Sequence, residues 1–402
     1  MARYKDYTNG SRRAMIIKAL LMTGAIPRRS AVLFPWHSEM TRRLLNKMVE
    51  ESVLVEKKSI KNRRFFALKA LTREQIPTEI ASQIPEVYLD YYESIGSDLR
   101  VKAMSRDSTG NVQERALNSS DAYLFFKGID AECDPDEKPF LLGDTDGIAE
   151  RQCYYFSREV KSVPGLYMDR VKEGKDESGR VNKQVFVSRA NGVYLSGTGL
   201  NYMVYDIGTH SIYWMKNAES NMIRHTEYIL YQLGFKEHSI HGAVFLYRGT
   251  SVLTTIFNQV NKPGTYRGKL SIDFLYNHMY VLPSTKEGQR LMRVMSKENW
   301  EYRFRKLFLS DDAIKNGDSE FDGLERGDTL TVYDIFCIPD IAKLKRFLAQ
   351  AKAKKETDRF IIYAFTFQRE FLEQICDKSN VTVKYADFTE FESKFLLDFD
   401  KR

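Results

Sequence analysis

Short strand-like runs alternate with helical segments throughout the last part of the chain. Each run is rich in β-branched and aromatic residues, and all but the last are followed by a helical pattern: AVFLYRG (243–249), MYVLP (279–283), LTVYDIF (330–336), RFIIYAF (359–365) and VTVKY (381–385). A helix that connects two strands of one sheet carries the chain back to its starting edge, so the strands run parallel. The alternation therefore predicts a largely parallel sheet and a mixed α/β fold.

A different pattern precedes these alternating segments. The runs VFVSR (185–189), VYLSG (193–197), YMVYDIG (202–208) and SIYWM (211–215) are separated by turn residues, and Asn191-Gly192 is a strong hairpin signal. These runs predict an antiparallel meander, which a helix over 219–233 covers. We expect one α/β domain over 112–402 that begins with a helix, with a subdivision near 236–242 as a further option. Residues 73–111 are expected to form a helical connector.

Positive charge is confined to the first fifth of the chain. The whole sequence has 61 Lys and Arg against 54 Asp and Glu, a formal net charge of +7. Residues 1–75 hold 17 of these basic residues and 6 of the acidic ones, so they carry +11 and the remaining chain carries −4. A confined basic surface on an otherwise slightly acidic protein is typical of a separate nucleic-acid-binding module.

The residues of this basic segment predict three helices and a hairpin. A helix over 11–22 stops at Gly24, a short segment (RRSAVLF) follows Pro27, and Ser38 is the expected N-cap of a third helix. Apolar residues fall on one side of that third helix, so Arg42 and Arg43 must project from the other. VLVEKK (53–58) and RRFFALK (63–69) then predict a hairpin with a basic tip.

This order over residues 10–72 resembles the winged helix-turn-helix superfamily, and we assign residues 1–72 to such a domain. The resemblance implies binding of double-stranded DNA, with the third helix in the major groove and the hairpin as the wing along the phosphates. A protein-docking role for the same fold is the alternative. The residues expected to contact DNA are Arg28, Arg29, Ser38, Thr41, Arg42, Arg43, Lys47, Lys57, Lys58, Lys61, Arg63 and Arg64.

A second resemblance concerns the meander. The stretch SRANGVYLSGTGLNYMVYDIGTHSIYWMKNAE (188–219), downstream of FSREVK (156–161), resembles replication-relaxation type winged-helix proteins of Gram-positive conjugative plasmids and integrative elements. It implies a sequence-specific accessory or regulatory protein in plasmid replication, maintenance or conjugative transfer. The α/β domain would then serve as a surface for homo-oligomers or protein partners. The resemblance transfers no catalytic residue.

Two other functions stay open. A metal-dependent, nuclease-like DNA-processing enzyme would need carboxylates and a lysine around Mg²⁺, for which the weak candidates are Asp206, Lys216 and Glu219. The spacing Lys-x-x-Glu departs from the usual Glu-x-Lys order, so we expect no catalytic residue, metal ligand or cofactor. The third possibility is an effector-responsive transcription regulator.

Several other classes of protein find no support in the sequence. No run of apolar residues is long enough for a membrane span, and the N-terminus lacks a secretory signal, so a cytoplasmic protein without membrane contact is expected. The four cysteines lie far apart and are expected to be reduced: Cys133, Cys153, Cys337 and Cys376. Asp144 and Asp146 match the Asp-x-Asp spacing of haloacid dehalogenase type phosphatases, but a simple turn made by these aspartates and the neighbouring glycines explains the pattern better. His238 and His241 lack the spacing of a relaxase metal motif.

Overall fold

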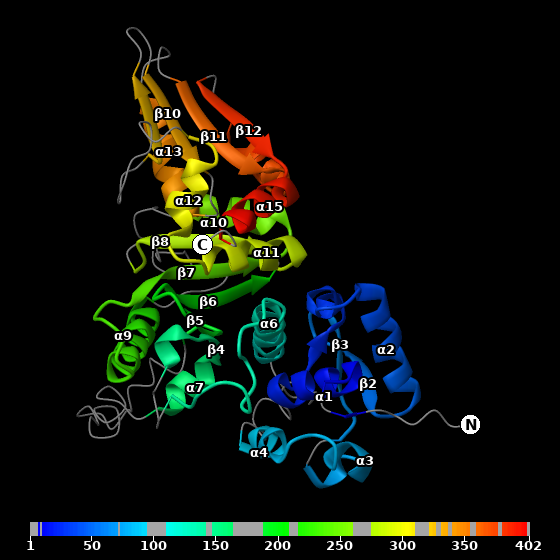
Figure 1. Ribbon diagram of the computed structural model, residues 1–402. Coiled ribbons are helices and arrows are strands. Elements are labelled where there is room, and N and C mark those ends of the chain that lie inside the picture. The colour runs from blue at the N-terminus through cyan, green and yellow to red at the C-terminus, as the bar shows by residue number, and fades with distance from the viewer. Residues whose placement is uncertain are drawn as a thin grey trace, which may run out of the picture.

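The protein is described by a computed structural model that combines helices with three sheets (Figure 1). The structure describes residues 7–8, 10–70, 73–94, 110–141, 147–163, 188–208, 216–259, 275–309, 321–326, 331–336, 340–353, 359–376 and 380–399. Within these ranges, no helix has both the length and the apolar character that a bilayer crossing requires.

The basic N-terminal segment folds into helices around a small antiparallel sheet. Its elements are α1 (Arg12–Thr23), β1 (Ile26–Pro27), the 3-10 helix η1 (Arg28–Leu33), α2 (Ser38–Glu50), β2 (Leu54–Lys58) and β3 (Arg64–Leu68). The strand order is β1-β3-β2. Ser11, where the sequence predicts the first helix to begin, caps α1 by accepting a hydrogen bond from the Ala14 amide (3.1 Å), and Gly24 ends the helix at φ 77°, as predicted.

The connector folds back onto the N-terminal segment. It contains η2 (Arg73–Gln75), α3 (Thr78–Ala81) and α4 (Glu86–Ser94), and residues 95–109 lie outside the described residues. Tyr88 of α4 is fully buried, and the Lys18 ammonium of α1 lies 4.4 Å from the centre of its ring. Leu89 is buried and Tyr91 hydrogen-bonds to Arg158, so this helix packs within its own chain.

Helix α6 (Gly110–Lys127) stands between the N-terminal segment and the large sheet (Figure 1). It contacts α1, β1 and η1 on one side and β4 and β6 on the other. One hydrophobic core runs through this junction, from Tyr7 and Leu20 past Phe126 and Tyr202 to Phe395. The basic segment is thus a built-in part of the molecule and shares its core.

The central sheet has five strands in the order β4-β5-β6-β7-β8. They are β4 (Gln152–Phe156), β5 (Gly192–Ser196), β6 (Asn201–Gly208), β7 (Ile240–Tyr247) and β8 (His278–Pro283). The first three strands are antiparallel and the last three parallel, which places the predicted meander and part of the predicted parallel set in one sheet. β6 and β7 are hydrogen-bonded neighbours, so the domain does not divide at 236–242. The expected strand at 211–215 and most of that at 185–189 lie outside the described residues.

Helices connect and cover these strands. They are η4 (Ile148–Glu150), α7 (Ser157–Ser162), α9 (Lys216–Gln232), α10 (Thr250–Gln259), α11 (Lys286–Met295) and α12 (Trp300–Lys306). The predicted helices after the meander and at Thr250 are confirmed. The predicted helix near Ser284 begins two residues later, with Thr285 as its N-cap.

The last strands form a second sheet, which the sequence did not separate from the first. Its strands are β9 (Gly323–Arg326), β10 (Thr331–Phe336), β11 (Arg359–Phe365) and β12 (Val381–Ala386), and β10, β11 and β12 are parallel. Helices α13 (Ile341–Ala353), η6 (Thr366–Gln368), α14 (Arg369–Ile375) and α15 (Phe388–Phe399) accompany them. The outer edge of β8 makes a single bridge, from Tyr280 to Asp340, and α13 packs on β8, so among the described residues no further strand pairs with β8.

Candidate nucleic-acid interface

Helix α2 has one face in the core and one in solvent. Leu45 and Met48 are fully buried, as the helical spacing predicts. The helix begins with His37 as its N-cap, whose Nδ1 accepts a hydrogen bond from the Glu39 amide (3.3 Å), one residue earlier than the predicted Ser38. Thr41, expected to contact DNA, is fully buried and its hydroxyl donates to the His37 carbonyl (3.4 Å). Thr41 therefore belongs to the internal face of this helix.

The outer face of α2 is basic. Arg42 is 47% and Arg43 80% exposed, and Lys47 is exposed one turn further on. Both arginines lie near the Glu39 carboxylate, at 3.8 Å and 3.3 Å. Solvent-exposed pairs of this kind contribute little free energy, so the two guanidinium groups can exchange Glu39 for a phosphate or a base edge at small cost.

The hairpin of β2 and β3 carries a second group of exposed cations. The Ser59 amide donates to the Arg63 carbonyl (2.8 Å), and Asn62 closes the turn at φ 62°, a conformation that asparagine tolerates well. Lys58, Lys61 and Arg64 are exposed around this tip, whereas Lys57 is half-buried.

Arg63 points inward from the same tip. Its side chain is only 12% exposed and donates hydrogen bonds to Glu114 (2.6 Å), Asn118 (2.8 Å) and Asp121 (2.9 Å), all on α6. The Ile60 amide also donates to Gln113 of α6 (2.9 Å). The tip of the hairpin is therefore docked on α6, and Arg63 holds it there. From the sequence alone, Arg63 is instead expected to face solvent and contact DNA.

Arg28 has a partner within the chain, and Arg29 is half-buried. Arg28 pairs with Glu56 on β2 at 2.8 Å. Burial, together with the neighbouring cations Arg248 and Arg63, lowers the pKa of Arg29 to about 10. Arg29 thus adjoins the buried charges beneath the hairpin, which leaves α2 and the outer hairpin as the basic surface.

The buried charges form what we call the arginine–aspartate cluster, made of Arg63, Asp121, Asp206 and Arg248. Arg248, at the end of β7, donates to Asp206 at the end of β6 (2.8 Å) and also pairs with Asp121 of α6. Both aspartate side chains are fully buried. Burial raises the pKa of Asp206 to about 6, while Arg248 acts in the opposite direction. The cluster ties the hairpin, α6 and the central sheet together.

The nuclease candidates are not brought together around a metal position. Glu219 is buried on the side of the sheet where Tyr205 lies, and accepts hydrogen bonds from Ser188 (2.7 Å), the Arg189 amide (2.7 Å) and Tyr205 (3.1 Å). Asp206 is the next residue of β6 and points to the opposite face, toward α6. The Lys216 side chain, Asp144 and Asp146 lie outside the described residues.

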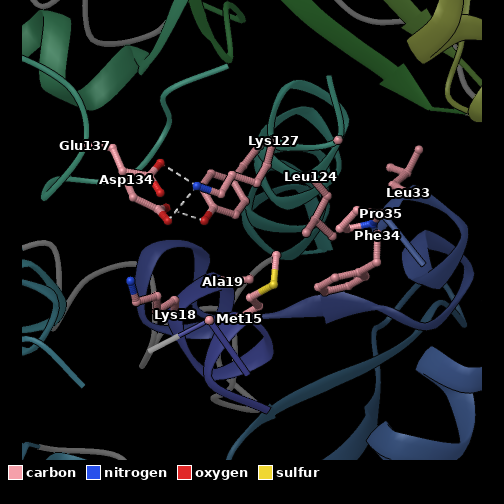
Figure 2. Close-up of a pocket in the computed structure, with 13 residues that line it drawn as sticks. Met15, Lys18, Ala19, Leu33, Phe34, Pro35, Leu124, Lys127, Asp134 and Glu137 are labelled. Atoms are coloured by element: carbon pink, nitrogen blue, oxygen red, sulfur yellow. Dashed lines mark hydrogen bonds and ion pairs between the residues drawn. The ribbon is translucent and has the colours of Figure 1, made fainter. Parts of the chain in front are cut away.

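A cavity of about 190 Å³ lies between α1, η1 and α6 (Figure 2). Met15, Ala19 and Leu33 give it apolar walls, and its rim carries Lys127, which pairs with Asp134 at 2.9 Å and also with Glu137. The volume is below the roughly 300 Å³ at which pockets for drug-sized ligands begin. The cavity therefore gives no specific support to the effector-responsive alternative.

Comparisons of the chain with protein-family models, curated proteins and solved structures found no match. The function has to be argued from the geometry and charge of the residues themselves. Those observations single out one surface, formed by the outer face of α2 and the exposed side of the hairpin.

Replacing Arg63 with Ala should destabilise the protein by about 3 to 5 kcal/mol, because it removes the buried partner of Glu114 and one of the two arginine partners of Asp121. Urea unfolding followed by far-UV circular dichroism measures this change. Lys61→Ala, two residues away and exposed, is the matched control and should stay within about 0.5 kcal/mol of the parent. Equal, small effects of the two substitutions would contradict the docked hairpin.

Glu219 should make stability fall as pH rises. Burial raises its pKa to about 7, from an ordinary value of 4.5, so the folded protein binds this proton more tightly than the unfolded chain does. About 3 kcal/mol of stability is therefore lost between pH 4.5 and about pH 7 through this group. Glu219→Gln should remove that part of the slope when urea midpoints are compared at pH 5 and pH 8. A slope identical to that of the parent would show that Glu219 stays ionised across this range.

Proposed function

We propose that the protein binds double-stranded DNA in the manner of a winged helix-turn-helix, with α2 in the major groove and the hairpin as the wing. The observation that carries this proposal is the outward display of Arg42, Arg43 and Lys47 on α2, whose opposite face is fixed in the core. A helix with one anchored face and one basic face fits the major groove, which is about 12 Å wide.

The arrangement of the small sheet supports the same proposal. The element order α1, β1, η1, α2, β2, β3 contains the predicted three helical segments and hairpin, with η1 as a 3-10 helix. β1 adds a third strand beside β3. β2 contacts α2, so we expect Lys58, Lys61 and Arg64 of the hairpin to reach the phosphates of a duplex whose major groove holds α2.

Charge partition favours one orientation on DNA. Residues 1–75 carry +11 and the rest of the chain −4, so the remaining surface is on balance repelled by the phosphate backbone. Electrostatic attraction thus brings the α2 side toward the duplex before any base is read.

We further propose that this binding serves the replication, maintenance or conjugative transfer of a mobile genetic element in the cytoplasm. The support is the resemblance of residues 188–219 to replication-relaxation type proteins. The mixed α/β part, which lies behind the proposed DNA-binding surface, would then carry contacts to further copies of the chain or to other proteins.

The double substitution Arg42→Ala/Arg43→Ala should lower affinity for the preferred DNA site by tenfold or more for each lost base contact. The site is first selected from a random oligonucleotide pool, and affinity is then measured by fluorescence anisotropy at constant salt. Arg346→Ala/Lys352→Ala is the matched control, since it removes two exposed cations from α13. An equal loss in the control, or no loss in the α2 variant, would refute the assignment.

Lys61→Ala/Arg64→Ala should weaken binding to all DNA sequences alike. Phosphate contacts release counterions, so the slope of log affinity against log salt should become shallower by about 1 for each lost contact. Titrations over a series of salt concentrations, on both the preferred site and an unrelated duplex, measure this slope. A loss confined to the preferred site would instead assign base reading to the hairpin.

A further inference from the structure

A β-bulge changes the direction of one histidine in the central sheet. Asn201 of β6 pairs with Ile240 and Tyr202 pairs with Gly242, so His241 is an extra residue in β7. Such an insertion re-aims a side chain relative to the regular alternation of a strand. The His241 ring accordingly lies edge-on to Tyr202, with a centroid distance of 5.6 Å, on the sheet face that also holds Tyr280.

The re-aimed ring meets a second histidine. The His278 ring, at the start of β8, stacks on His241 with a centroid distance of 4.6 Å. Glu301 approaches from α12, and the possible ligand atoms of His241, His278 and Glu301 all lie within 4.8 Å of one another. The Tyr280 hydroxyl lies between them, 3.1 Å from His241 Nε2 and 2.9 Å from a Glu301 oxygen.

The surroundings hold these side chains in place. Trp300, the residue before Glu301, is buried and packs edge-on against Tyr280 at 5.9 Å, which fixes the first turn of α12. Asp340 is buried and lies 3.0 Å from His278 Nδ1 through one oxygen, while its other oxygen accepts from the Ala342 and Lys343 amides at the start of α13. A carboxylate on Nδ1 sets the ring orientation and directs Nε2 as the donor atom, as in many metal centres.

We propose that His241, His278 and Glu301 bind a divalent transition-metal ion of the zinc class, with Asp340 as the residue that positions His278. Two imidazole nitrogens and one carboxylate oxygen are the donors that Zn²⁺ prefers, whereas Mg²⁺ prefers oxygen ligands and retains water. All three residues are partly exposed, so an ion can reach them from solvent. The three ligands come from β7, β8 and α12, so a bound ion would tie α12 to the edge of the central sheet.

The test uses the full-length protein, stripped with a chelator and returned to chelator-free buffer. Titration with Zn²⁺ against a chromophoric competitor should show one tight site per chain, and an excess of Mg²⁺ should not displace the ion. Co²⁺ should give the visible absorption of a tetrahedral or five-coordinate nitrogen and oxygen site. Absence of a tight site in the stripped parent protein would overturn the proposal.

The substitutions assign the ligands. His278→Ala and Glu301→Gln should each weaken Zn²⁺ binding at least a hundredfold, and Asp340→Asn should weaken it ten- to a hundredfold. His238→Asn is the matched control, because His238 is exposed three positions before His241 and its φ of 56° suits asparagine. Parent-like binding by His278→Ala and Glu301→Gln, or equal loss in His238→Asn, would show that the ion binds elsewhere.

Folding defects are separated from ligand loss by the conservative variant. Glu301→Gln keeps the side-chain shape and an oxygen that accepts from Tyr280, so its metal-free melting temperature should match that of the parent. Zn²⁺ at the same concentration should raise the melting temperature of the parent and of His238→Asn, and raise that of Glu301→Gln clearly less. An equal rise in all three proteins would overturn the assignment of Glu301.

Discussion

The packing of α6 between the basic N-terminal segment and the central sheet determines how the rest of the molecule is arranged. On one side α6 holds Arg63 of the hairpin, and through Asp121 it also reaches Arg248, directly after β7. Buried ion pairs add little net stability relative to apolar packing, yet removing one partner costs several kcal/mol. The arginine–aspartate cluster therefore fixes the relative position of three parts of the chain more than it strengthens the fold. The apolar core around Phe126 supplies the burial that holds α6 in place.

A docked hairpin changes how the basic surface can work. In a free wing, the cations of the tip would lose conformational freedom when they bind a phosphate. Here Arg63 and the Ile60 amide already attach the tip to α6, so Lys61 and Arg64 are presented from a fixed support. Fewer basic side chains face solvent than the sequence suggests, but the exposed ones at the tip are carried by a hairpin that is attached to α6.

Much of the fold followed from the sequence because local signals determine it. The first helix near residues 11–22, its stop at Gly24 and the alternation after residue 243 each depend on neighbouring residues. The predictions that the structure corrects concern features that depend on contacts between residues far apart in the sequence. Arg63 meets α6 more than fifty positions away, and the division into two sheets concerns which strands pair across distant parts of the chain. Thr41 was misread because a polar side chain can enter a core when its hydroxyl bonds to a backbone carbonyl.

The shared core also determines how the basic segment can be studied. Gln289 of α11 donates hydrogen bonds to the carbonyls of Leu33 (3.1 Å) and Phe125 (3.1 Å), and Lys286 donates to that of Phe34 (2.7 Å). Removing the first seventy residues would leave these donors and the apolar side of α6 exposed. A truncated chain that binds no DNA could then have lost the proposed binding through unfolding as readily as through loss of the basic surface. Exposed side chains on α2 do not have this disadvantage, since their removal leaves the core intact, so substitutions there separate recognition from stability.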